Sequence, residues 1–313
     1  MKLLFCILFV LFFVGRGASV CAQSSQTVPN GNNGALAGLF SVAEGRQVRF
    51  SKGNLQYSTK GTHACADGTT KPGTWRFAEY QYSYVGSASQ VSYYNDKPSG
   101  NVPGSDNANI GSSYEGWIDL FGWGTSGYNG CEPFWSTMAE LRYGPAGEYN
   151  LTDTNANYDW GVYNAISNGG DVPNKWRVLT MDEWEYMCSG RVYAASKWGY
   201  ATVNGVQGVV FLPDNWTLPT SCTFTSGCES GWTTNSYTDS QWVALETAGA
   251  VFLPAAGYRY GVQLNIDNPD GYYWSSTAYF NKYASRLDFN SSQLRTNYSS
   301  FRSYGYSVRL VCE

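Results

Sequence analysis

Short apolar runs, broken by glycine and polar turns and without a sustained helical period, make up the chain from residue 39 onward. Residues 40–42 and 48–51 have the period of two that is typical of half-buried strands, with a turn signal between them at residues 44–45. Residues 209–213 and 250–254 are apolar throughout and end at proline, as expected for buried strands. The pattern excludes a coiled coil and predicts an α+β fold that is rich in strands and loops.

Two short helices are expected within this strand pattern. Thr180 followed three residues later by Glu183 is a capping-box signature, which predicts a helix starting there. Residues 239–248 predict a second helix, with an Asp/Ser start and Gly249 as its end. Residues 80–85 are expected to form a further strand, and no linker interrupts residues 39–313, which predicts a single domain.

Residues 1–22 have the features of a secretory signal peptide: Lys2, an apolar run of twelve residues, and Val20-Cys21-Ala22 at the cleavage site. The apolar run is shorter than the ~20 residues that a membrane-spanning helix needs. Residues 23–38 are polar and predict a flexible leader. The chain is thus expected to be secreted or held at the cell surface, with membrane attachment only if Cys21 is lipidated.

Composition excludes several classes of function. The chain has 20 basic and 24 acidic residues, and loss of the signal removes two bases and no acids, so no nucleic-acid partner is expected. His63 is the only histidine, which rules out sites that need two imidazoles. No cofactor and no metal site is expected. Clusters such as Asp214-Asn215 and 267–270 offer oxygen ligands for calcium but are more typical of plain turns.

Six cysteines remain after the signal, and an even number in an exported chain predicts three disulfides. They are Cys65, Cys131, Cys188, Cys222, Cys228 and Cys312, and their spacing fits no metal motif. Six cysteines allow about 15 pairings, so the residues alone leave the connectivity open.

Residues 279–306 form a strip rich in Tyr, Ser, Asn and Arg, the composition of adaptable binding surfaces. Alternation predicts Leu287 and Phe289 in the core and Arg286 and Asp288 facing solvent. Residues 297–301 show no period and are expected to be a loop. The alternative is an ordinary exposed strand pair whose tyrosines lie flat on the sheet.

Several motifs in order resemble a known family. Residues 176–186 (WRVLTMDEWEY) resemble the R-L-P-T-x-x-E-W-E-Y segment of the formylglycine-generating-enzyme and sulfatase-modifying group, a variant of the C-type lectin fold. Residues 305–309 (GYSVR) resemble its final strand. Residues 53–57, 75–79, 117–124, 255–259 and 271–277 resemble secreted proteins of gut Bacteroidales.

In some of these proteins the carboxy-terminal strip is the variable region of a diversity-generating retroelement, in which adenine randomisation scatters Asn codons to Tyr, Ser, Phe, Arg and Asp. Leu287, Phe289, Gly305 and Val308 match the constant positions of such strips. The resemblance implies an exported, non-enzymatic receptor or adhesin on a C-type lectin-like scaffold, with an unknown protein or glycan as partner. It implies the ligand-binding positions Tyr283, Ser285, Arg286, Asp288, Arg295, Tyr298, Ser299, Ser300, Phe301 and Tyr304.

For the disulfides we then expect Cys188–Cys312, Cys65–Cys131 and Cys222–Cys228. An oxidase of the formylglycine-generating kind needs a pair of cysteines in the carboxy-terminal part, and residues 229–311 contain none. The remaining alternative is a fixed structural module, such as a fimbrial tip.

Overall fold

The computed structural model describes residues 33–86, 102, 105–138, 142–266 and 269–313. Residues 31–313 form one compact unit. The expected signal peptide at residues 1–22 and most of the expected leader lie outside the described residues. The packed part begins earlier than residue 39, because Leu36 is buried and its backbone N–H donates to the carbonyl of Phe50 at 2.8 Å.

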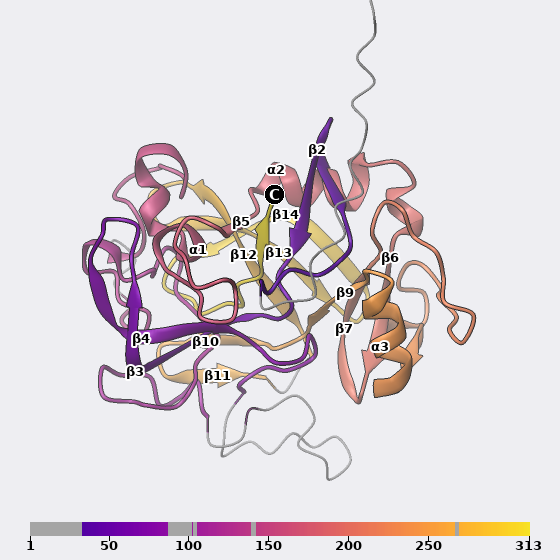
Figure 1. Ribbon diagram of the computed structural model, residues 1–313, viewed down its shortest axis with the longest axis horizontal. Helices are drawn as coiled ribbons and strands as arrows, with labels where there is room; N and C mark the ends of the chain where they lie inside the picture. The colour runs from indigo at the N-terminus through magenta and orange to yellow at the C-terminus, as the bar shows by residue number, and fades with distance from the viewer. Residues whose placement is uncertain (1–32, 87–101, 103–104, 139–141, 267–268) are drawn as a thin grey trace, which may run out of the picture. The chain divides into compact units, whose positions relative to one another are not determined.

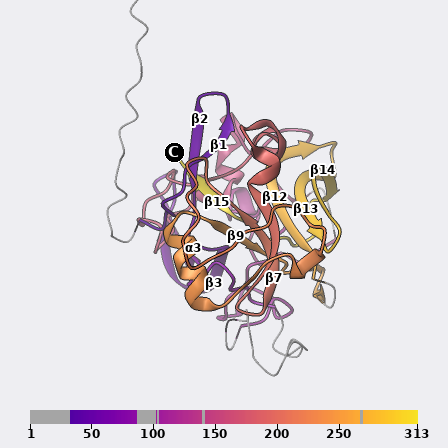
Figure 2. The same cartoon turned by 90° about the vertical axis from the view of Figure 1, so that its right-hand side faces the viewer.

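The described strands form five sheets, and the helices between them are few and short, as the predicted α+β class requires (Figures 1 and 2). The first sheet has the order β1-β2-β15-β5, with bounds Phe40–Ala43, Arg46–Phe50, Leu310–Cys312 and Arg177–Val178. The second is the hairpin of β3 and β4, at Leu55–Ala64 and Thr70–Phe77. The third has the order β8-β6-β7-β9, at Ser236–Tyr237, Trp198–Val203, Val206–Phe211 and Val251–Pro254.

The last two sheets carry the candidate site. The hairpin of β10 and β11 consists of Tyr258–Tyr260 and Gln263–Asn265. The three-stranded sheet β12-β13-β14 is antiparallel, with bounds Gly271–Tyr279, Tyr283–Asn290 and Gln293–Phe301.

Several expected elements are confirmed. The strands at residues 40–42 and 48–51 pair as β1 and β2 around the turn at residues 44–45. The two apolar runs pair with each other as β7 and β9, and every residue of β9 is buried. The prediction of a strand at residues 80–85 is wrong. This segment is an irregular turn, held by the backbone N–H of Val85 donating to Asp119 Oδ2 at 2.8 Å.

Both expected helices are present, and each starts with a capping box. Helix α2, Met181–Glu185, has Thr180 as its N-cap and continues into one π-helical segment, Tyr186–Gly190. Helix α3, Asp239–Thr247, begins at the expected residue. Its N-cap is Thr238, with Gln241 completing the capping box, rather than the expected Asp or Ser. Helix α1 is a single turn at Trp160–Tyr163. In the described part of the chain no helix is long and apolar enough to cross a membrane.

The sheet β12-β13-β14 lies between two apolar cores. Leu287, Phe289 and Tyr273 belong to the first core, which they share with β1, β2, β7, β9 and α2. Trp274 and Ala284 belong to the second, which they share with the β3–β4 hairpin. In Figure 1 the β3–β4 hairpin (indigo) and the β6–β9 sheet (salmon to orange) accordingly lie on opposite sides of the yellow sheet. Both faces of β13 and most of β12 are therefore covered, whereas β14 remains half-exposed.

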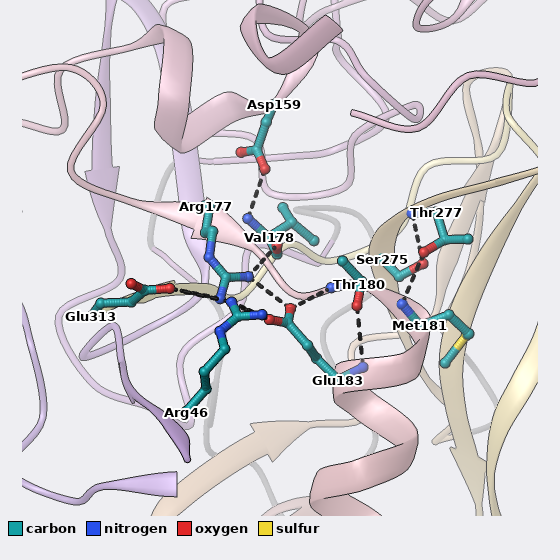
Figure 3. Close-up of polar contacts among 10 residues, drawn as sticks. All are labelled: Arg46, Asp159, Arg177, Val178, Thr180, Met181, Glu183, Ser275, Thr277 and Glu313. Atoms are coloured by element: carbon teal, nitrogen blue, oxygen red, sulfur yellow. Dashed lines mark hydrogen bonds and ion pairs between the residues drawn. The ribbon is translucent and has the colours of Figure 1, made fainter. Parts of the chain in front are cut away.

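The family-like segment at residues 176–186 builds an ion-pair network around a buried carboxylate (Figure 3). Arg177 donates from Nη1 and Nη2 to the two carboxylate oxygens of Glu183 at 2.7 and 2.8 Å, and Arg46 donates to the same group at 3.0 Å. Glu183 also accepts from the backbone N–H of Thr180 at 2.8 Å. One carboxylate thus caps α2 and ties it to β2 and β5.

The same segment anchors the sheet that carries the strip (Figure 3). The backbone N–H of Met181 donates to Thr277 Oγ1 of β12 at 2.9 Å. The backbone N–H of Val178 donates to Asp159 Oδ2 at 2.8 Å, and burial raises the pKa of Asp159 to about 6. These contacts give the segment a scaffolding role.

All six expected disulfide cysteines are free thiols, so the three pairings are not formed. Cys188 lies in the first core and Cys312 packs against the second. Cys222 belongs to a third core under α3, whereas Cys228 contacts the carbonyl of Ser292 in the β13–β14 turn at 3.4 Å. Cys188 and Cys312, like Cys222 and Cys228, thus pack against different cores, which sequence spacing alone could not show.

Candidate ligand-binding surface

The carboxy-terminal strip is a continuous strand meander. Residues 297–301, expected as a loop, belong to β14, where Tyr298 pairs with Arg286 and Phe301 with Tyr283. The absence of a period has a physical reason. Most of β14 is half-exposed, with Tyr298 45% exposed, so no apolar alternation is needed.

The side chains of β13 are oriented only partly as expected. Leu287 and Phe289 are buried in the first core, as predicted. Arg286 and Asp288, expected to face solvent, are 8% and 0% exposed. The cause is the chain after residue 304, which pairs with β12 through a parallel bridge between Tyr273 and Ser307. There the backbone N–H of Trp274 donates to the carbonyl of Ser307 at 3.1 Å, and Tyr306 covers the sheet.

Arg286, Asp288 and Arg295 form a charge triad across the two strands. Arg286 Nη2 lies 2.9 Å from Asp288 Oδ2, and Arg295 Nε donates to Asp288 Oδ1 at 2.5 Å. Burial lowers the pKa of Arg295, but the hydrogen bond and charge of Asp288 outweigh it and raise the pKa overall. The carboxylate therefore neutralises part of two guanidinium charges below the surface.

Aromatic rings surround this triad. The Arg286 guanidinium lies 5.3, 5.9 and 5.5 Å from the ring centres of Tyr272, Tyr298 and Tyr306, and that of Arg295 lies 4.3 Å from Tyr298. These distances suit cation–π attraction. Burial raises the pKa of both Tyr272 and Tyr306, so their hydroxyls stay protonated at neutral pH.

The serines of β14 hold Arg286 in place. Its Nη1 donates to the Ser299 carbonyl and to Ser300 Oγ, and Ser300 Oγ also lies 2.7 Å from the Tyr306 hydroxyl. Nε of Arg286 is buried without a hydrogen-bond partner. Ser285 is different, because it is buried and its carbonyl accepts from Ser275 Oγ within the sheet.

A row of aromatic rings extends the surface away from the triad. Tyr283 stacks on Phe301 at 4.5 Å between ring centres, and Phe301 lies 6.0 Å from Tyr304. Tyr304 in turn stacks on Tyr258 at 5.8 Å and meets Tyr260 edge-on at 5.2 Å. Every expected site residue except Ser285 is thereby linked by one chain of contacts.

The β10–β11 hairpin supplies residues that the sequence argument missed. Together with Tyr304 it lines a recess of about 320 Å³, formed by Tyr258, Tyr260, Gln263, Leu264 and Asn265. The hairpin is fixed to the strip, since Arg259 and Gly305 exchange two backbone hydrogen bonds at 2.9 and 2.8 Å. Tyr258 and Tyr260 alternate around the buried Arg259, and this alternation was the signal available in the sequence.

Metal ligands do not gather on this surface. Within the described ranges no group of three or more His, Cys, Asp or Glu side chains could hold a metal ion. Asp214, considered above for calcium, accepts instead from Ser41, Gln47 and Arg191. Residues 267–268 of the other candidate lie outside the described residues.

Comparison with known proteins adds one finding. A family described as "Domain of unknown function (DUF8237)" matches residues 229–311, a stretch that contains both the β10–β11 hairpin and the strip. No curated protein matches the chain. No solved structure matches it either.

Proposed function

We propose that the chain is an exported, non-enzymatic binding protein that presents residues 283–304 and the β10–β11 hairpin to a protein or glycan ligand. The scaffold in this proposal is C-type lectin-like. The observation that carries the proposal is the chain of aromatic contacts that starts at the Arg286–Asp288–Arg295 triad and continues through Tyr304. Tyr and Arg are the residues that most often dominate binding energy at interfaces, and here they gather on one surface.

The surface has a rigid floor and adaptable outer positions. Arg286 and Asp288 are buried and hydrogen-bonded, so they shape the site and contribute an electric field. Tyr298, Phe301 and Tyr304 are exposed or half-exposed and can meet a ligand directly. Rigid anchors on a firm sheet bind at small entropic cost.

The same arrangement suits diversification by a retroelement. Leu287 and Phe289 point into the first core, so their exchange would disturb packing. The side chains at 298 and 301 belong to no core, and Tyr304 is only partly buried, against the second core. Positions 286, 288 and 295 form an intermediate group, because they are joined through ion pairs. Diversification of the strip should therefore leave Leu287 and Phe289 constant. Changes at positions 286, 288 and 295 should occur together.

A formylglycine-generating oxidase is the enzymatic alternative, and nothing in the strip favours it. Residues 229–311 contain no cysteine, and the one carboxylate of the triad is already paired with two guanidinium groups. In this proposal the amino-terminal residues 1–22 direct export, and the partner lies outside the cell that makes the chain.

The proposal can be tested with fluorescently labelled full chain on intact cells of the source community and on a glycan array. Substituting Tyr298→Ser and Tyr304→Ser should remove binding to whichever target retains the wild type. The matched control is Tyr149→Ser with Tyr193→Ser, which removes two tyrosines that are 64% and 78% exposed elsewhere on the surface. Equal loss in both double variants, or none in either, contradicts the proposed site.

A further inference from the structure

A second recess, separate from the strip, lies between the β3–β4 hairpin and the loop at residues 126–134. Its volume is about 300 Å³, within the range of small-molecule sites. Its walls are mainly apolar and aromatic, with Tyr57, Trp75 and Phe134 among its lining residues. It shares no lining residue with the recess at Tyr304.

The wall beside Trp75 is rigid and desolvated. The rings of Tyr57 and Trp75 lie 4.7 Å apart, and His63 meets Trp75 edge-on at 6.4 Å. Both nitrogens of His63 are engaged, with the Gly73 carbonyl at 2.9 Å and Asn164 Oδ1 at 2.8 Å. Trp75 is fully buried, yet its Nε1–H has no hydrogen-bond partner. The fold therefore leaves one polar group behind this wall unsatisfied.

Two opposite charges line the same recess. Lys71 donates to the Gly127 carbonyl at 2.6 Å, which leaves two of its ammonium protons free. Glu132 lies close enough to Tyr57 for its charge to add to the effect of burial, and together they raise the pKa of Tyr57 to about 12. Neither Lys71 nor Glu132 forms an ion pair with any residue of the described ranges.

We infer that this recess binds a small zwitterion of the α-amino acid type with an apolar or aromatic side chain. The carboxylate of the ligand meets the Lys71 ammonium group, and its own ammonium group meets Glu132. The side chain packs among Tyr57, Phe134 and the neighbouring prolines. A ligand with one charge would leave the opposite protein charge without a partner, which favours the zwitterion.

The size of the recess sets a further limit. A volume of about 300 Å³ accommodates a single amino acid but not an extended peptide or oligosaccharide. The site is therefore independent of the macromolecular ligand proposed for the strip, and its failure would leave that proposal unaffected.

Calorimetry with the full chain tests the inference. The probes are L-leucine, L-phenylalanine and L-tryptophan, each compared with its amide, which lacks the carboxylate, and its N-acetyl derivative, which lacks the ammonium. We expect binding of at least one free amino acid, and at least tenfold weaker binding of both derivatives. Because His63 is the only histidine, its imidazole proton resonance reports occupancy of this recess without ambiguity.

Two variants match the two ligand derivatives. Lys71→Met should weaken binding of the free amino acid as much as amidation of the ligand does. Glu132→Gln should weaken binding as much as N-acetylation of the ligand does. The control is the exposed Lys60–Glu115 ion pair at 3.0 Å, whose Lys60→Met and Glu115→Gln variants should bind normally. An unchanged His63 resonance with all free amino acids overturns the inference, and so does wild-type affinity in both recess variants. The ligand derivatives keep the test decisive even if a variant fails to fold.

Discussion

Removal of the Asp288 carboxylate should destabilise the chain strongly, because two guanidinium groups depend on it. The Asp288 side chain is 1% exposed and lies 2.9 Å from Arg286 and 2.5 Å from Arg295. Breaking a buried ion pair by removing one partner costs about 3–5 kcal/mol. The Arg295 side chain is 26% exposed, so solvent screens its share, and we expect Asp288→Asn to cost about 3 kcal/mol.

The partner substitution makes the argument sharper. Arg286→Met leaves Asp288 paired with Arg295, so its cost should be about 2 kcal/mol. The double variant Arg286→Met with Asp288→Asn removes both charges of the buried Arg286–Asp288 pair, so neither is left without its partner. Its cost should fall below the sum of the single variants by about 1.5 kcal/mol.

Equilibrium unfolding in urea, followed by tryptophan fluorescence, measures these values. Glu229→Gln removes an exposed carboxylate that forms no ion pair with any described residue, and it should stay within about 0.5 kcal/mol of wild type. The reasoning is refuted if Asp288→Asn costs less than about 1 kcal/mol, or if the two single effects add within about 0.5 kcal/mol.

Three further predictions concern the scaffold. Burial raises the pKa of Asp119 from 3.8 to about 6, so the folded chain holds a proton that the unfolded chain releases. The stability that this group contributes is therefore lost as the pH rises from about 4 to above 6. Between pH 4 and pH 7 the free energy of unfolding of Asp119→Asn, measured in urea, should rise by about 2–3 kcal/mol relative to that of the wild type. Glu183→Gln should cost about 3 kcal/mol through the Arg177 pair and the α2 cap, whereas the exposed Glu185→Gln should be nearly neutral; a comparable loss in both would contradict the network in Figure 3. Alkylation followed by mass spectrometry should label all six cysteines after unfolding without reductant but chiefly Cys228 and Cys312 in the folded chain, and unlabelled pairs after unfolding would show disulfides.

Local signals predicted the elements that depend on local chemistry. The capping box at Thr180 and Glu183 correctly predicts the start of α2, because both of its hydrogen bonds lie within four residues. The apolar runs that became β7 and β9 were predictable because a strand buried on both sides needs apolar residues throughout.

The failures concern long-range contacts. Alternation along β13 separates two faces but does not say whether the second face meets solvent or a second core, so from alternation alone Arg286 and Asp288 are expected to face solvent. Their pairing with Arg295 depends on a register shift between Arg286 and Asp288, which no local pattern marks. The contribution of the β10–β11 hairpin likewise required the contact between Arg259 and Gly305.

Sequencing of codons 279–306 from many cells of the source population, together with the flanking DNA, tests the diversified binding surface most directly. We predict that changes cluster at positions 283, 298, 299, 301 and 304, that positions 286, 288 and 295 change together, and that Leu287, Phe289, Gly305 and Val308 stay constant. A near-copy of the strip should lie close by as a template. An invariant strip without a nearby template would contradict diversification and leave an ordinary fixed surface.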